Sequence, residues 1–271
     1  MASVGVRVIG CLVLALGLAG CSSDRADSVA GRGELVIGVK ADQPGLAVRG
    51  PDGVFRGFEV EVGRYVARRL GASKVTFRAV TSDDRERHLE ARAVDLVLAS
   101  YSITPERAVQ VTFGGPYYLA RQDIMVRREE RRIRDVRGLA GRRVCQAAGS
   151  VSGERVTVGL GIAVRAVPAP SYSACLSRLL AGDVDAVSTG DLVLAGFAAQ
   201  AAGKVRMVNA PFTDEPYGVG LRKGDIEGCE AVNRAITLMY QDGTAARLLR
   251  TWFGASRLRL TESVPQFEGC S

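Results

Sequence analysis

Residues 99–107 read Ala-Ser-Tyr-Ser-Ile-Thr-Pro-Glu-Arg, and they join two elements that can be recognised from composition alone. The preceding residues, 94–99, form an apolar run of strand length. Thr104, Pro105 and Glu106 are residue types that favour an N-cap, a first helical position and an acidic first turn. The sequence therefore predicts a strand that passes through a hydroxyl-rich turn into a helix.

This turn carries groups suited to binding an anion. Ser100, Ser102 and Thr104 supply hydroxyls, the helix start supplies free backbone N–H groups, and Arg107 supplies a guanidinium. An arginine can bind a carboxylate through two parallel hydrogen bonds, which a lysine cannot do. Taken alone, the pattern favours a plainer interpretation, in which these residues only begin a surface helix.

A resemblance to a known family favours the anion site. The pattern hydroxyl-x-hydroxyl-Pro-Glu-Arg after an apolar strand resembles the substrate turn of the family 3 extracellular solute-binding proteins, the polar amino acid receptors of ABC importers. Residues 57–62, Gly-Phe-Glu-Val-Glu-Val, and the Trp-Phe-Gly at 252–254 fit the same family, so the likeness spans about residues 34–254. Residues 38–45 are similar to glutamate-binding lipoproteins of high-GC Gram-positive bacteria.

Strand and helix patterns alternate along the chain in two blocks. The first block has strand patterns at 34–39, 75–80 and 94–99, with helical patterns at 58–70 and 85–92. The second block has strand patterns at 142–145, 163–167 and 184–187, with helical patterns from 152 onward and at 172–180. Alternation of this kind predicts a parallel sheet covered by helices. The predicted fold class is α/β.

Two segments rich in Gly and Pro, 114–118 and 211–217, are predicted to cross between the blocks. The resemblance implies a two-lobed, type II periplasmic-binding-protein-like fold, with a ligand cleft between the lobes. We assign residues 34–118 and 217–271 to lobe 1, and residues 119–216 to lobe 2. A site between two lobes can close by a hinge.

The first 33 residues carry export features. Arg7 precedes an apolar run at 8–19 that is too short to span a membrane, so residues 1–20 are predicted to be a signal peptide. Cys21 follows Leu-Ala-Gly and resembles the lipidated cysteine of a bacterial lipobox; an ordinary signal peptide is the alternative. Residues 21–33 are predicted to be a lipid-anchored linker. The expected location is the outer face of the cell membrane.

The formal charge of +7 comes overwhelmingly from arginines spread along the chain, with few basic clusters and no interleaved aromatics. This pattern and the exported location argue against a nucleic-acid partner. A zinc site is disfavoured because no Cys-x-x-Cys spacing occurs and His88 is the only histidine. No metal and no cofactor are expected.

Four cysteines follow Cys21 in an exported chain, which indicates two disulfides with three possible pairings. We favour Cys145–Cys175 and Cys229–Cys270, because each then closes a loop inside one predicted lobe and leaves the lobes free to move. Loops of this size would each stabilise the fold by roughly 3 to 4 kcal/mol.

The resemblance also implies the ligand contacts. The α-carboxylate of an amino acid would be held by Arg107 and Ser102, with a main-chain contact from Ser100, and Ser150 would offer a hydroxyl from the second lobe. Similar glutamine receptors carry a carboxylate at the position of Lys40, and acidic amino acid receptors tend to place an arginine at that of Arg85. Two cations at the distal end of the ligand would favour glutamate or aspartate over glutamine or asparagine, although both could be plain surface residues.

One position departs from the family pattern. Relatives usually present an aspartate for the ligand ammonium after the two hydroxyls that follow the 184–187 strand, but this chain has Gly190 there and Asp191 one place later. Glycine's freedom in φ could let the turn shift so that Asp191 binds the ammonium. Otherwise the chain would bind an acid that lacks an amino group, such as a dicarboxylate.

Three functions are compatible with these residues. The first is a monomeric, lipid-anchored receptor that captures glutamate or aspartate for ABC permease subunits, and the second is an extracellular sensor that passes ligand-induced closure to a membrane signalling partner. The third, an enzyme, is disfavoured because His88 lies on a predicted exposed helix face and no Ser-His-Asp or Cys-His set can be assembled. The carboxylates of Glu59 and Glu61 face differently on a helix, which argues against joint catalysis.

Overall fold

The computed structural model describes residues 1–2, 28–256, 258–260 and 262–270. The predicted lipidation site and nearly all of the predicted signal peptide lie outside these residues, as does the first part of the predicted linker. Of the helices in the described part of the chain, none is long and apolar enough to cross a membrane.

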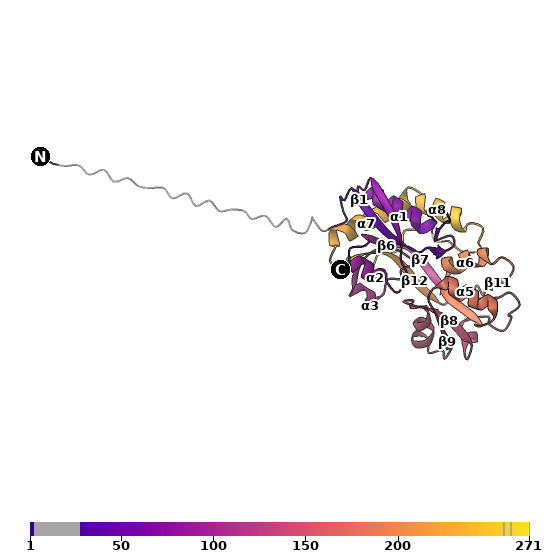
Figure 1. Ribbon diagram of the computed structural model, residues 1–271. Helices are drawn as coiled ribbons and strands as arrows, with labels where there is room; N and C mark the ends of the chain where they lie inside the picture. The colour runs from indigo at the N-terminus through magenta and orange to yellow at the C-terminus, as the bar shows by residue number, and fades with distance from the viewer. Residues whose placement is uncertain (3–27, 257, 261, 271) are drawn as a thin grey trace.

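One nine-stranded sheet runs through the molecule (Figure 1). Its strands follow the order β5-β1-β6-β12-β7-β10-β8-β9, and β11 pairs with β7 at the same end as β10. The bounds are β1 Glu34–Val39, β5 Lys74–Ala79, β6 Leu96–Leu98, β7 Val111–Arg127, β8 Arg143–Ala147, β9 Arg165–Ala169, β10 Ala186–Gly190, β11 Val205–Met207 and β12 Thr213–Arg222. A small second sheet contains β2 Asp42–Gln43, β3 Ala47–Arg49 and β4 Phe55–Arg56.

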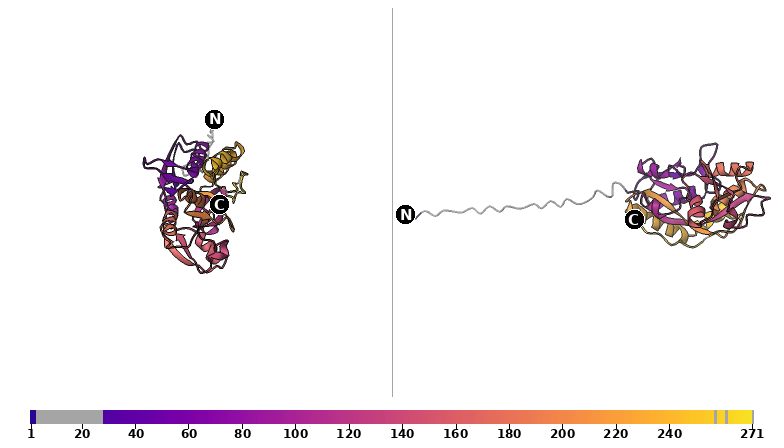
Figure 2. Two further views of the ribbon diagram at one scale, coloured as in Figure 1. Left: turned by 90° about the vertical axis from the view of Figure 1, so that its right-hand side faces the viewer. Right: turned by 90° about the horizontal axis from the view of Figure 1, so that it is seen from below.

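Two long antiparallel strands, β7 and β12, connect the ends of the sheet. They pair from Val111 with Arg222 at one end to Gln122 with Thr213 at the other. We call the part built on β1, β5 and β6 the β1 lobe, and the part built on β8, β9, β10 and β11 the β8 lobe; Figure 2 shows them one above the other in its left view. The predicted crossing segments fall largely within these two strands.

Helices cover the sheet in both lobes. Their bounds are α1 Phe58–Arg69, α2 Arg85–Glu90, α3 Pro105–Ala108, α4 Ser152–Glu154, α5 Tyr172–Ala181, α6 Asp191–Gln200, α7 Ile226–Gln241 and α8 Thr244–Phe253, with short turns of other helical pitch at Val136–Leu139 and Arg155–Gly159. Helix α1 packs on α7 and α8 in the β1 lobe, whereas α5 packs on β8 and β9 in the β8 lobe.

Two expectations about regular structure need correction. Parallel pairing is confined to β1 with β5 and β6, and to β8 with β9 and β10; every strand pair that involves β7 or β12 is antiparallel, so the sheet is mixed. The helix expected from Ser152 onward is only three residues long before it widens at Arg155–Gly159. The antiparallel pairs form because the chain returns to the β1 lobe beside its own outgoing strand.

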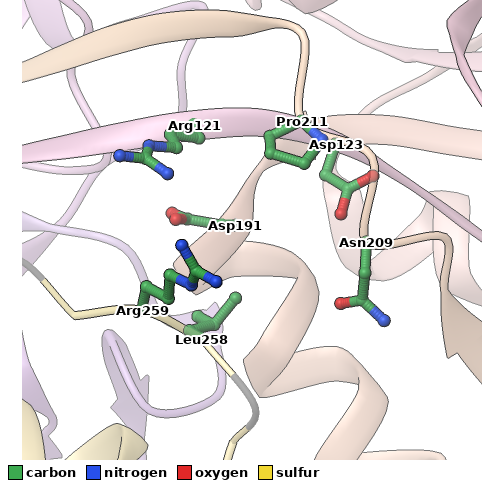
Figure 3. A pocket seen from close by; sticks show the side chains of 7 residues that line it. All are labelled: Arg121, Asp123, Asp191, Asn209, Pro211, Leu258 and Arg259. Atoms are coloured by element: carbon green, nitrogen blue, oxygen red, sulfur yellow. The ribbon is translucent and has the colours of Figure 1, made fainter.

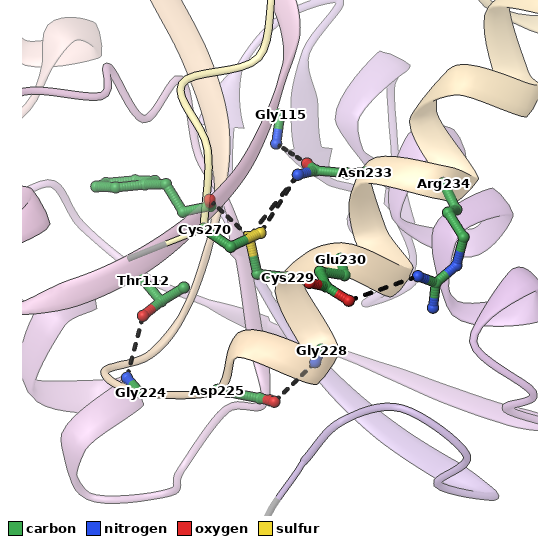
Figure 4. Close-up of a disulfide and its surroundings, with 11 residues drawn as sticks. Thr112, Gly115, Gly224, Asp225, Gly228, Cys229, Glu230, Asn233, Arg234 and Cys270 are labelled. Carbon is green, nitrogen blue, oxygen red and sulfur yellow. Dashed lines mark hydrogen bonds and ion pairs between the residues drawn. A yellow bond between two sulfur atoms is a disulfide. The ribbon is translucent and has the colours of Figure 1, made fainter.

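Both predicted disulfides are present in the structure. Cys145 in β8 is bonded to Cys175 in α5, and Cys229 in α7 is bonded to Cys270 in the C-terminal segment. Beside the second bond, the side chain of Asn233 in α7 accepts a 2.7 Å hydrogen bond from the backbone N–H of Gly115 in β7 (Figure 4). Each disulfide therefore joins elements on one side of the crossing strands.

Candidate functional site

The residues of the hydroxyl-rich turn line a polar cavity that both lobes form. We call it the arginine cavity. Its lining residues are Ser82, Arg85, Ser100, Ser102, Arg107, Ser150, Val151, Ser152, Tyr172, Thr189, Gly190, Glu215 and Tyr217. Five of the predicted ligand-binding residues are therefore brought together from distant parts of the chain, namely Arg85, Ser100, Ser102, Arg107 and Ser150.

The start of α3 holds Arg107 in place. Thr104 is the N-cap, and its hydroxyl accepts a hydrogen bond from the backbone N–H of Arg107 at 3.3 Å. The guanidinium of Arg107 donates to the carbonyl of Ser102 at 2.9 Å, which folds the side chain back over the turn. Burial and the charge of Arg85 lower the pKa of Arg107 to about 10, so this arginine remains a cation at neutral pH.

A buried carboxylate fixes the other end of the turn. Ser100 adopts a left-handed backbone conformation with φ 45°, which is uncommon outside glycine. Its backbone N–H donates to Oε1 of Glu59 at 2.6 Å, and the same oxygen accepts a hydrogen bond from the Tyr117 hydroxyl. Burial raises the pKa of Glu59. Glu59 thus holds the strained turn, whereas Glu61 pairs with Arg64 on a partly exposed face of α1.

The carbonyl oxygen of Gly149 connects the two arginines to the β8 lobe. It accepts hydrogen bonds from Arg107 at 2.9 Å and from Arg85 at 3.5 Å. Arg85 is only 1% exposed, and its guanidinium lies 3.7 Å from the centre of the Tyr101 ring, a favourable cation–π geometry. Gly149 has φ +68°, and a Cβ there would lie 2.3 Å from the Ser82 carbonyl, so the lobes approach backbone to backbone.

The β8 lobe contributes a set of linked hydroxyls. The Ser150 hydroxyl lies 2.5 Å from that of Tyr172 and 3.3 Å from that of Ser152, and Ser152 in turn reaches Thr189 at 3.4 Å. Hydroxyls both donate and accept, so this group can rearrange around an anion or an amine.

Lys40 lies in a neighbouring cavity that shares Ser82 and Tyr172 with the arginine cavity and has a volume of about 160 Å³. Its ammonium donates to the Ser82 hydroxyl at 2.7 Å. Burial and the charge of Arg85 lower the pKa of Lys40 to about 7. Ser82 thus connects Lys40 to the cavity that Arg85 and Arg107 line.

Glu215 is a lining residue that the sequence analysis did not single out. It lies on β12, is 3% exposed, and is the only acidic side chain among the described residues that line the arginine cavity. Its sequence context, a segment rich in Gly and Pro between two lobes, gives no sign of burial. Pairing of β12 with β7 carries it inward.

Asp191 does not line the arginine cavity, contrary to the expectation for the ligand ammonium. It lines a separate cavity of about 310 Å³ between Arg121 and Arg259 (Figure 3). The expected turn shift is absent, because Gly190 has φ −62° and ψ 146°, which any residue can adopt. Instead, a Cβ on Gly190 would lie 2.0 Å from the Tyr217 hydroxyl, so the absence of a side chain makes room for that tyrosine.

The lobes are closed in this structure. The arginine cavity has a volume of about 20 Å³, which admits little more than one water molecule. A larger ligand therefore enters only when the lobes separate and the guanidinium groups leave the Gly149 carbonyl. A carboxylate competes well for these donors, because hydrogen bonds between ionised partners are shorter and stronger than those to a neutral carbonyl.

Comparison with known proteins agrees with this geometry. Residues 35–255 match the family described as bacterial extracellular solute-binding proteins, family 3. The chain belongs to this family. It is 37% identical to the glutamate-binding protein GluB of Corynebacterium glutamicum over 86% of this chain and 83% of that protein. It is 28% identical to the ABC transporter glutamine-binding protein GlnH of Bacillus subtilis, over 81% of each chain.

Solved structures of amino-acid-binding proteins have the same architecture. An ancestral arginine-binding protein bound to glutamine is 32% identical and superimposes with a TM-score of 0.76, covering 82% of this chain and 99% of that one. The predicted two-lobed α/β fold of type II is confirmed. In the described part of the chain, no group of three or more His, Cys, Asp or Glu side chains is arranged to hold a metal ion.

Proposed function

We propose that this protein is the substrate-binding component of an ABC amino acid importer and that it captures glutamate or aspartate between its lobes. The observation that carries the proposal is that Arg107 and Arg85 line one cavity and Lys40 lines the cavity that adjoins it. A ligand with one carboxylate needs only Arg107. A dianionic ligand could extend from the first cavity to the second, and similarity to the glutamate-binding protein GluB supports this choice.

In this proposal Arg107 and the turn residues Ser100 and Ser102 bind the α-carboxylate, Ser150 adds a hydroxyl from the other lobe, and Arg85 and Lys40 meet the distal carboxylate. The ligand takes the place of the Gly149 carbonyl as the acceptor that links the lobes. Closure is then favoured by contacts that only the closed state completes.

The proposal also includes the location and partners of the protein. The lipid anchor is Cys21, and the partners are the permease subunits of the importer. The tether is shorter than the predicted linker 21–33, because Ser28 and Val29 are already buried and Val29 is hydrogen-bonded to Asp225. Residues 34–118 and 217–271 form lobe 1, and residues 119–216 form lobe 2. The protein acts as a monomer and carries out no chemistry on its ligand.

The ligand class can be tested by thermal shift and calorimetry on the mature protein. Glutamate or aspartate should raise the melting temperature more than glutamine or asparagine at the same concentration, because a ligand that binds more tightly stabilises the folded protein more. A ligand at 100 times its Kd stabilises the folded protein by about 2.7 kcal/mol. Lys40→Asp should reverse or abolish this order, because a carboxylate at that position accepts from an amide and repels an acid.

The matched control is Lys74→Asp, which changes the same residue type at an exposed position, 65% exposed, where the lysine pairs with Glu34. This variant should keep the wild-type ligand order. Equal shifts by acids and amides in the wild type would contradict the role given to Lys40. Binding of no amino acid at all would overturn the proposed function.

A further inference from the structure

The arginine cavity is well supplied with cations but poor in acids. An α-amino acid carries an ammonium as well as its carboxylates, and a buried ammonium needs acceptors, preferably a charged one. Among the described residues that line the cavity, the two arginines face a single carboxylate, that of Glu215. From β10, Thr189 and Gly190 line the cavity, and neither of them supplies a charged acceptor.

The carboxylate of Glu215 is only half satisfied. Its Oε1 accepts from Nε of Arg155 at 3.2 Å and from the Thr213 hydroxyl at 3.3 Å. Its Oε2 is buried and has no hydrogen-bond partner among the described residues. A buried acceptor without a partner costs free energy, and most such atoms in proteins have a structural or functional reason.

The alternative acid, Asp191, is otherwise engaged. Its Oδ1 accepts the backbone N–H of Leu192 at 2.8 Å, and its Oδ2 lies 3.5 Å from the Tyr118 hydroxyl, outside the arginine cavity.

We infer that Glu215 binds the ligand ammonium through its free Oε2 and so makes this cavity selective for α-amino acids over dicarboxylates. The inference rests on the proposed function and refines it. Glu215 binds the ammonium and the arginines bind the carboxylate that are attached to the same α-carbon of the ligand. When a ligand lacks the amine, the carboxylate of Glu215 faces the carboxylate of the ligand with no cation between them. Arg155, which is 39% exposed, fixes the orientation of Glu215 without occupying Oε2.

The test compares L-glutamate with glutarate, which differs only by the missing amine, using isothermal titration calorimetry. The wild-type protein should bind glutamate much more tightly than glutarate. Glu215→Gln should weaken glutamate binding by at least about 30-fold, the usual effect of removing one partner of a buried charge pair. The same variant should bind glutarate as well as the wild type or better, and this binding shows that its cavity is intact.

Asp191→Asn is the matched control, since it neutralises a buried carboxylate that lies outside the arginine cavity and should leave the preference for glutamate unchanged. If Asp191→Asn loses the preference, or Glu215→Gln keeps it, the inference is wrong. If Glu215→Gln fails to fold, Glu215→Asp replaces it. The shorter side chain should weaken glutamate but not glutarate, and an unchanged glutamate affinity would overturn the inference. A wild-type protein that binds neither probe nor any amino acid would instead contradict the proposed function.

Discussion

Lys40 and Asp191 are buried ionisable residues whose pKa values lie far from their ordinary ones. Burial lowers the pKa of Lys40 to about 7 and raises that of Asp191 to about 6. In both cases the folded protein favours the neutral form of the side chain. The titration of Lys40 should therefore make ligand affinity depend on pH, and the titration of Asp191 should make folding stability depend on pH.

We expect glutamate binding to take up protons above pH 7. A ligand carboxylate beside Lys40 would raise the pKa of Lys40 above about 7. The carboxylates of Asp42, Glu59 and Asp84 already raise this pKa, whereas burial and the charge of Arg85 lower it. Between pH 7 and 9 the complex then holds more protons than the free protein, so affinity falls as the pH rises through this range. Calorimetry at pH 8 in buffers of different ionisation enthalpy should show this uptake, and Lys40→Gln should abolish it; its absence in the wild type would count against a ligand carboxylate beside Lys40.

Asp191→Asn should stabilise the protein at neutral pH. The folded-state pKa of about 6 exceeds the ordinary value of 3.8, so the folded protein binds more protons than the unfolded chain between these values and loses stability as the pH rises through them. This shift corresponds to about 3 kcal/mol at pH 7. The charged side chains that line the same cavity as Asp191 are Arg121, Arg259 and Asp123, the neutral Tyr118 hydroxyl contacts its Oδ2, and all four residues remain in the variant.

Urea unfolding at pH 4 and pH 7 measures this effect. The gain in unfolding free energy from Asp191→Asn should be largest at pH 7 and shrink towards pH 4. Asp214→Asn, at an exposed position near Arg121, is the control and should show no such gain. An Asp191→Asn variant that is less stable than the wild type at pH 7 would contradict the prediction. It would show that neighbouring groups stabilise the charged carboxylate of Asp191 by more than its burial costs.

At the scale of elements, helices with one buried face could be predicted from the sequence, whereas a helix whose first seven residues are all buried could not. Helix α1 was predicted because its apolar residues recur at helical spacing. Helix α6 was missed, because every residue from Asp191 to Phe197 is buried and no polar face gives the pattern a period. Residues 114–118 were predicted to cross between the blocks, but their place in the long strand β7 was not predicted, because Gly114, Gly115 and Pro116 interrupt the strand pattern. The hydrogen bonds of β7 come from β12, far along the chain, and local composition cannot show them.

The same distinction applies to the site. The residues of the turn, from Ser100 to Arg107, were found because one short motif contains them. Glu215 was missed because only the pairing of β12 with β7 and the approach of the two lobes bury it. Asp191 was assigned to the ligand because a neighbouring residue departs from the family pattern, and the structure shows that the helix start at Asp191 directs its side chain elsewhere.

At the scale of the molecule, closure depends on how closely α6 approaches the β1 lobe. A Cβ on Gly196 would lie 1.8 Å from the carbonyl oxygen of Pro44, in the turn that follows β2. Gly196→Ala should therefore hold the lobes apart and weaken ligand binding. The substitution should not harm the helix itself, because alanine is favoured over glycine in helices by about 1 kcal/mol.

Small-angle X-ray scattering with saturating glutamate should show a larger radius of gyration for Gly196→Ala than for the wild type, together with a higher Kd. Ala199→Ser, at an exposed position on the same helix, is the control and should match the wild type in both measurements. Unchanged scattering and affinity in Gly196→Ala would contradict this prediction, and would mean that the Pro44 turn moves to accommodate the added methyl group while the lobes still close.

Val29 and Cys270, which lie near the two ends of the described segment 28–270, are both fastened to the start of α7. The backbone N–H of Val29 donates to the Asp225 carboxylate at 2.9 Å, and Cys270 is bonded to Cys229 one helical turn further on. Anything joined to either end is thus carried by the β1 lobe as one rigid unit. A probe attached beside Val29 or Cys270 would stand still relative to that lobe during ligand capture, and the whole of the motion would appear as a swing of the β8 lobe about β7 and β12.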